Sequence, residues 1–170
     1  MQMRNLIKEK IAANGYAVGV FVASSSATNC EILAMNGYDF AVIDCEHAQT
    51  DSETAVNMFR ACEMYGMAPM VRVYNPYDGP MMSRLLDVGA HGIMVPLVND
   101  GAQAKNIVDS TKYAPVGRRG ANGGRGPRWG AYDDYVKVCN DNTLTFVQCE
   151  SIEGVNNIEE IAALPGVDGV

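Results

Sequence analysis

Short apolar runs alternate with helical patterns along almost the whole chain, and this alternation restricts the fold more than any other feature. The runs have the length of buried strands, and a stretch with apolar residues at helical spacing separates each from the next. A chain that repeats strand and helix returns to the same end of one sheet, so a parallel α/β sheet is predicted. The expected strands are 16–23, 39–44, 68–73, 92–98 and 143–149, with a sixth beginning at 166–170.

Helices are predicted between these runs from apolar residues that recur every three to four positions. Thr50 and Glu53 have the spacing of a capping box and indicate the start of the helix that Gly66 ends. The other expected helices are 3–13, 27–36, 81–89, 101–112, 131–139 and 154–163.

Polar residues at the strand ends favour a barrel over a doubly wound sheet. Asp44, Arg72 and Glu150 fall at the C-terminal ends of three different strands. Such convergence is typical of the catalytic face of a (β/α)8 barrel, known as a TIM barrel, whereas an open sheet uses the crevice at its switch point. Residues 1–170 are expected to form a single barrel domain. A whole barrel typically needs about 250 residues, so this chain is short for a complete one, and about six strands are expected in it.

Composition excludes several classes of protein. The formal charge of −7 argues against nucleic-acid binding, because phosphate contacts need a basic face. Five cysteines without C-x-x-C spacing argue against a disulfide framework and a structural zinc site, and favour a reducing, cytoplasmic setting. No signal peptide is expected, and no apolar run approaches the length of a membrane span.

The first candidate site is Asp44-Cys45-Glu46-His47, which follows a strongly apolar strand. A histidine near a carboxylate can be held in one tautomer and act as a base near neutral pH. Acidic residues also favour the start of a following helix. That alternative explains Asp51 and Glu53 better than His47, so catalysis is slightly favoured for this segment.

Three further charged residues need a reason for their positions. Arg72 lies inside an apolar strand, so it either binds a carboxylate ligand or forms a buried ion pair with Asp44 or Glu150; both remain open. Gln148 and Glu150 share one side of their strand, and Glu150 taken alone could be a solvated residue just past it. Asp87 sits near the end of an apolar helix, where the macrodipole disfavours negative charge, and needs a histidine or arginine partner unless it is simply exposed.

The glycine- and arginine-rich segment 114–130 has neither a dinucleotide-binding fingerprint nor a P-loop. A long loop over a site or at a subunit contact is one interpretation, and a merely flexible loop is the other. His91 is expected to be structural rather than catalytic.

Taken together, these segments resemble the HpcH/HpaI aldolase family, which includes 4-hydroxy-2-oxoheptanedioate aldolases. The resemblance runs over nearly the whole chain and is specific in order and spacing, although no single segment is. The segments are 39–47, Val71-Arg72, 84–90, Val95-Pro96, 119–130 and 147–150.

The resemblance implies a class II aldolase, a carbon–carbon lyase that releases pyruvate and an aldehyde from a 4-hydroxy-2-oxo acid through a metal-stabilised pyruvate enolate. It implies a divalent metal (Mg, Mn or Co) and a homo-oligomer, often a hexamer. Glu150 resembles one metal carboxylate, and Arg72 the residue that binds the pyruvate carboxylate. His47, supported by Asp44 and Asp87, resembles the acid–base centre, and Gln148 a substrate-site residue.

Two features keep alternatives open. The resemblance implies that the barrel domain is incomplete at its C-terminus, because the family's second metal carboxylate is an aspartate expected beyond Val170. The chain could therefore also be a non-catalytic module that binds a metal or an oxo acid. The arginine-rich loop keeps open a related barrel lyase that acts on a coenzyme A thioester. No lysine is expected at a strand end, which disfavours a Schiff-base aldolase.

Overall fold

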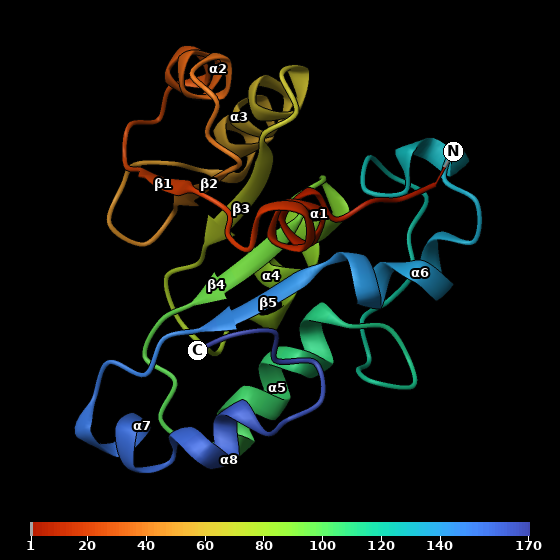
Figure 1. The fold of residues 1–170 in the computed structure, drawn as a ribbon. Coiled ribbons are helices and arrows are strands. Elements are labelled where there is room, and N and C mark those ends of the chain that lie inside the picture. The colour runs from red at the N-terminus through yellow and green to blue at the C-terminus, as the bar shows by residue number, and fades with distance from the viewer. Residues whose placement is uncertain (1) are drawn as a thin grey trace.

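The computed structural model describes residues 2–170 and contains one parallel sheet whose strands follow in sequence order (Figure 1). A doubly wound sheet reverses its strand order part-way, whereas a barrel keeps it. The sequential order therefore confirms the α/β barrel type, with five strands of it. The strands are β1 (Gly19–Val22), β2 (Phe40–Asp44), β3 (Ala68–Arg72), β4 (Gly92–Val95) and β5 (Leu144–Val147).

Helices connect the strands and cover both faces of the sheet (Figure 1). Helices α2 to α5 each follow one strand, and α1 lies across the opposite face. The helices are α1 (Leu6–Asn14), α2 (Ala27–Met35), α3 (Ser52–Met64), α4 (Gly79–Asp87), α5 (Gly101–Thr111), α6 (Tyr135–Asn142), α7 (Ile152–Asn156) and α8 (Ile158–Ala162), with the 3-10 turn η1 (Arg128–Gly130).

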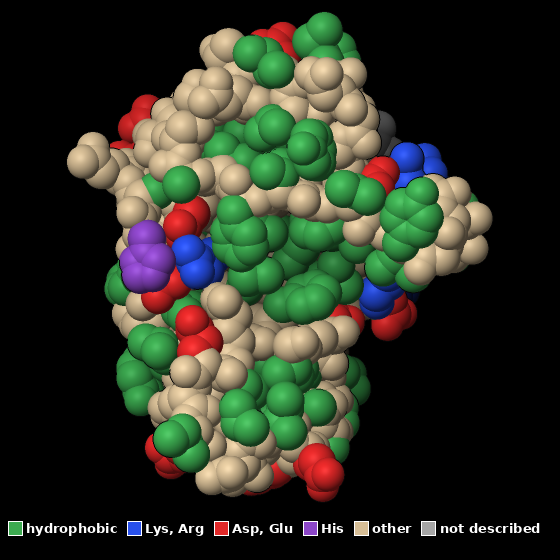
Figure 2. All heavy atoms as spheres, turned by 60° about the vertical axis from the view of Figure 1, so that its left-hand side comes forward, with side chains coloured by type: hydrophobic (Ala, Val, Ile, Leu, Met, Phe, Trp, Pro, Cys, Tyr) green, Lys and Arg blue, Asp and Glu red, His purple; other side chains and the backbone are tan. Residues whose placement is uncertain are grey.

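The two faces of the sheet carry different side chains, because successive residues of a strand point to opposite faces. Ile43, Val71 and Ile93 point outward into the main core beneath the helices. The inner face carries a smaller cluster that α1 covers near the strand starts through Leu6 and Ile7. Figure 2 shows a broad hydrophobic area bordered on one side by acidic, basic and histidine side chains.

Register places one row of inner residues level across the sheet. Asp44 pairs with Arg72, Arg72 with Met94, and Met94 with Phe146, which forms an isolated bridge to Gly169. The row contains a charged pair at one end and apolar residues at the other. The layered interior of a barrel has this arrangement, and its last layer opens onto the C-terminal strand ends.

Several predicted boundaries differ from the structure. Residues 166–170 form only the bridge at Gly169 and no sixth strand. The helix expected at 131–139 begins at Tyr135, after a turn in which Arg128 and Trp129 have positive φ. The helix expected at 154–163 is interrupted at Asn157 and forms α7 and α8.

The start of α3 also differs from the prediction. The N-cap is Asp51, whose carboxylate accepts a hydrogen bond from the backbone N–H of Thr54 at 2.8 Å. The hydroxyl of Thr50 instead lies 2.9 Å from that of Ser25. The predicted capping box of Thr50 and Glu53 is therefore wrong, because the better acceptor, Asp51, lies one residue further along.

The inside–outside pattern predicts different costs for the same truncation at two isoleucines. Ile43→Ala removes a fully buried side chain from the main core and should lower the free energy of unfolding by about 2–5 kcal/mol. Ile32→Ala on α2 is the matched control, because this side chain is 51% exposed, and it should change stability by less than about 0.5 kcal/mol. Urea denaturation of both variants provides the measurement, and equal losses would contradict the assigned core.

Candidate active site

Asp44 organises the turn that follows β2. Its carboxylate accepts two hydrogen bonds from Arg72, at 3.0 Å from Nε and 2.8 Å from Nη2. Its Oδ1 also accepts the backbone N–H groups of Glu46 at 3.0 Å and His47 at 3.3 Å. Asp44 therefore accepts four hydrogen bonds, three at Oδ1 and one at Oδ2. Its role is to hold the turn and the guanidinium.

The pKa of Asp44 reflects this environment. Burial opposes its ionisation, but the Arg72 hydrogen bonds and the two backbone N–H groups outweigh that effect and hold the pKa below its ordinary value. The carboxylate is therefore charged near neutral pH and is a poor proton acceptor there.

Arg72 is held in place by Asp44 but still has unused N–H donors. Its hydrogen bonds with Asp44 raise its pKa, and the negative charges of Asp44, Glu46 and Glu150 add to this effect. Nη1 lies 3.1 Å from Glu46, and Cζ lies 5.1 Å from the ring centroid of Phe21. A guanidinium has five N–H donors. At most three are engaged here, so the two that remain can bind a planar carboxylate.

His47 projects from this turn with a side chain that is 70% exposed. Its Nε2 lies 3.6 Å from Oε2 of Glu46. The imidazole is therefore accessible to a ligand at the open end of the sheet. Its neighbour Cys45 is no candidate nucleophile, because burial raises the pKa of that thiol to about 11.

Glu150 approaches the same strand ends from β5. Its Oε1 accepts a hydrogen bond from the backbone N–H of Leu97 at 3.0 Å, and Leu97 has a left-handed φ of 58° that turns this N–H toward it. Gln148 continues the strand pairing, because its backbone N–H donates to the carbonyl of Val95 at 2.9 Å. The buried Oε1 of Gln148 has no hydrogen-bond partner among residues 2–170.

Glu150 and Gln148 offer oxygen atoms of the kind that a divalent cation prefers. Mg²⁺ and Mn²⁺ favour carboxylate and amide oxygens, and Glu150 with the unpartnered Gln148 oxygen fits that preference. Within residues 2–170, however, no group of three or more His, Cys, Asp and Glu side chains could hold a metal ion. The described residues therefore supply part of a donor set.

Asp87 does not join this group within one chain. It ends α4 and precedes β4, which places it where the strands begin, at the opposite end of the sheet from Asp44. Its carboxylate accepts hydrogen bonds from Arg119 at 2.7 Å and from Asn122. Asp87 thus has an arginine partner and anchors the glycine- and arginine-rich segment.

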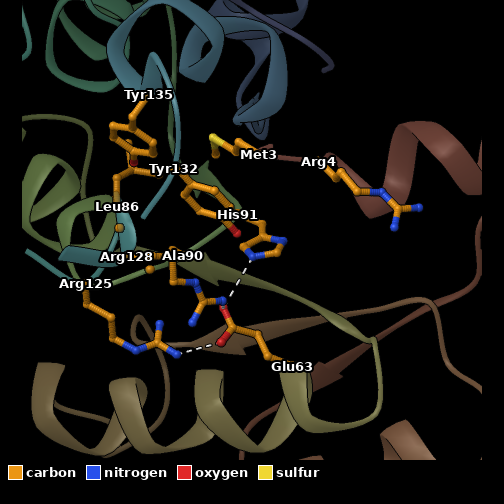
Figure 3. Close-up of a pocket in the computed structure, with 12 residues that line it drawn as sticks. Met3, Arg4, Glu63, Leu86, Ala90, His91, Arg125, Arg128, Tyr132 and Tyr135 are labelled. Atoms are coloured by element: carbon orange, nitrogen blue, oxygen red, sulfur yellow. Dashed lines mark hydrogen bonds and ion pairs between the residues drawn. The ribbon is translucent and has the colours of Figure 1, made fainter. Parts of the chain in front are cut away.

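A second polar cluster fixes the rest of that segment (Figure 3). Glu63, at the end of α3, lies 2.6 Å from Arg125, 2.8 Å from Arg128 and 3.4 Å from Nε2 of His91. The adjoining cavity holds about 20 Å³, which is room for roughly one water molecule. This cluster stabilises the loop at the strand-start end, and His91 is part of its framework.

The structure thus brings Asp44, His47 and Arg72 together, with Glu150 close enough to affect the charge of Arg72. Gln148 follows β5 at the same end of the sheet. Sequence reasoning missed the contacts of Glu46 and the role of Leu97. Alternation along β2 could have placed Asp44 inward, but no sequence signal reveals that the backbone of Leu97 has a positive φ.

A family model described as HpcH/HpaI aldolase/citrate lyase matches residues 17–170. The chain belongs to this family. The 2-keto-3-deoxy-L-rhamnonate aldolase of Escherichia coli strain K12 is 34% identical over 172 residues, covering 99% of this chain and 63% of that protein. The hydroxypyruvate/pyruvate aldolase of Chromohalobacter salexigens is 40% identical over 154 residues, covering 89% and 60% respectively.

A solved HpcH/HpaI aldolase from Desulfitobacterium hafniense DCB-2 superposes with a TM-score of 0.88 at 29% identity, covering 98% of this chain and 64% of that one. The chain therefore has the family's fold and spans about 63% of the length of the first curated relatives it matches. Among the described residues, no helix has both the length and the apolar character needed to cross a membrane.

The Glu63 cluster predicts a specific pH dependence of stability. Burial alone would raise the pKa of Glu63, but His91, Arg125 and Arg128 together lower it from 4.5 to about 2. A depressed folded-state pKa contributes stability that is present above the unfolded value and is lost as the pH falls toward the folded value. The stability advantage of wild type over Glu63→Gln should therefore shrink by roughly 3 kcal/mol between pH 4.5 and pH 2.

Urea denaturation of both proteins from pH 6 downward measures this difference. An advantage that stays constant over the acidic range would show that Glu63 is not the ionised centre of the cluster.

Proposed function

We propose that this protein is a divalent-metal-dependent aldolase that cleaves 4-hydroxy-2-oxo acids to pyruvate and an aldehyde. The observation that carries the proposal is Arg72, fixed at the strand ends by Asp44 with two N–H donors free. The named relatives support it, since both are called aldolases.

Arg72 binds the substrate carboxylate through its two free donors. This contact orients the neighbouring 2-oxo group toward the side of the site where Glu150 lies. His47 takes the proton from the C4 hydroxyl. The C3–C4 bond then breaks, its electron pair passes toward the 2-oxo group to give the pyruvate enolate, and C4 leaves as the aldehyde. Protonation of C3 completes pyruvate.

When bound, a divalent metal (Mg, Mn or Co) supplies Lewis-acid stabilisation of negative charge in this reaction. Glu150 is proposed as one ligand, and the second carboxylate is proposed to lie beyond Val170 in a longer protein. Arg72 adds positive charge on the other side, and Gln148 is proposed to contact the substrate through its free amide oxygen.

The setting of the reaction is also proposed. Free cysteines throughout the described residues favour a reducing compartment, and the cytoplasm fits this. A homo-oligomer, a hexamer by resemblance to the family, would bury exposed side chains such as Trp129.

Metal removal tests the reaction class. The protein, extended to the length of its relatives, should release pyruvate from a 4-hydroxy-2-oxo acid, and EDTA should abolish the release. Added Mn²⁺, Co²⁺ or Mg²⁺ should restore it. A coupled pyruvate assay provides the measurement, and activity that survives complete metal removal would exclude this mechanism.

Two substitutions separate the proposed roles. Glu150→Ala should abolish Mn²⁺ binding measured by calorimetry. His47→Ala should retain that binding and lower turnover by about 10²–10⁴-fold, the range of a general acid–base group. Glu153→Ala, an exposed carboxylate on α7, is the matched control and should change neither. Normal rates in both test variants would show that the site is assigned to the wrong residues.

A further inference from the structure

Glu46 lies between Arg72 and His47, the two side chains with proposed roles in binding and proton transfer. Its Oε2 is 3.1 Å from Nη1 of Arg72 and 3.6 Å from Nε2 of His47. The Glu46 side chain is only 11% exposed, whereas the imidazole is largely in solvent. A buried carboxylate therefore lies between a guanidinium held by Asp44 and an exposed ring.

The bonding of Glu46 is incomplete. No donor among residues 2–170 is aligned well enough to hydrogen-bond its buried Oε2. The charge of Arg72 compensates the carboxylate, but a buried acceptor without a hydrogen bond still carries a desolvation cost. A small rotation of the exposed His47 ring would bring its Nε2–H within hydrogen-bond range. Catalytic hydrogen bonds are often long before a ligand binds.

Other carboxylates near the site are already engaged. Asp44 accepts four hydrogen bonds, from Arg72 and from two backbone N–H groups. Glu150 accepts from Leu97. Asp87 is held at the opposite end of the sheet by Arg119. Among the described residues of this chain, Glu46 is the carboxylate that lies against the imidazole of His47, whereas Asp44 contacts only its backbone N–H.

We propose that Glu46 is a positioning residue that orients the imidazole of His47. By accepting the Nε2–H, Glu46 fixes the neutral ring in the tautomer whose lone pair is on Nδ1. Nδ1 is then the atom that takes the proton from the substrate hydroxyl. This inference rests on the proposed aldolase function for its kinetic consequence, but the Glu46–His47 contact itself does not.

The kinetic test uses the protein at the length of its relatives and a double-mutant cycle. Glu46→Met removes the acceptor at similar size and should lower kcat for pyruvate release by about 10-fold, less than the loss of the base itself. Glu46→Gln retains an amide oxygen as acceptor and should recover most of this loss. In the His47→Ala background, Glu46→Met should cause no further loss beyond about 2-fold.

Two outcomes would overturn the inference. Losses that multiply in the double variant would show that Glu46 acts independently of His47. A rise in KM for the oxo acid with unchanged kcat would show that Glu46 acts by holding Arg72 instead. Glu53→Met, an exposed carboxylate on α3, is the matched control and should leave both constants unchanged.

A measurement without turnover keeps the two proposals distinguishable. The chain has two histidines, so the ring proton signals of His47 can be compared with those of His91 by NMR at one fixed pH. Glu46→Met should shift the His47 signals and leave those of His91 unchanged. Unchanged His47 signals would refute the Glu46 contact, whereas absent pyruvate release in wild type would refute only the aldolase proposal.

Discussion

The bidentate ion pair of Asp44 and Arg72 fixes the geometry at the C-terminal ends of the strands. It joins the ends of β2 and β3 at the register position where the two residues are already paired. The same carboxylate takes the N–H groups of the next turn, so the position of His47 depends on it. Removing one partner of such a buried pair leaves an uncompensated charge, which costs about 3–5 kcal/mol. Stability and site geometry therefore depend on the same contact.

The opposite end of the sheet has a different chemistry. There, Asp87 and Glu63 hold the glycine- and arginine-rich segment through Arg119, Arg125 and Arg128. These pairs lie where the strands begin, away from the open end near Arg72. Barrels commonly separate stabilising contacts from reactive groups in this way. The loop that looks most unusual in the sequence is thus tied down at the strand-start end in this chain.

The sequence was most informative where periodicity decides the outcome. Strand order, the inward direction of Asp44 and Arg72, and the need of Arg72 for a carboxylate follow from alternation and burial. It was least informative where one side chain chooses among several partners. Asp87 could pair with any cation until the turn at its helix end placed it beside Arg119. Similarly, Asp51 displaced Thr50 as the cap through a one-residue difference, and the backbone of Leu97 has no sequence signature.

Charge balance at the strand ends supports the proposed need for a cation. Asp44, Glu46 and Glu150 all act on the single guanidinium of Arg72 and help to raise its pKa. A 2-oxo acid brings a further carboxylate to the same place, so one arginine cannot offset the accumulated negative charge. At partly buried sites such repulsion amounts to several kcal/mol, because the effective dielectric is far below that of water. A divalent cation next to Glu150 would reverse the sign of the local charge. The surplus carboxylates would hold this cation, and the cation would in turn favour binding of the anionic substrate.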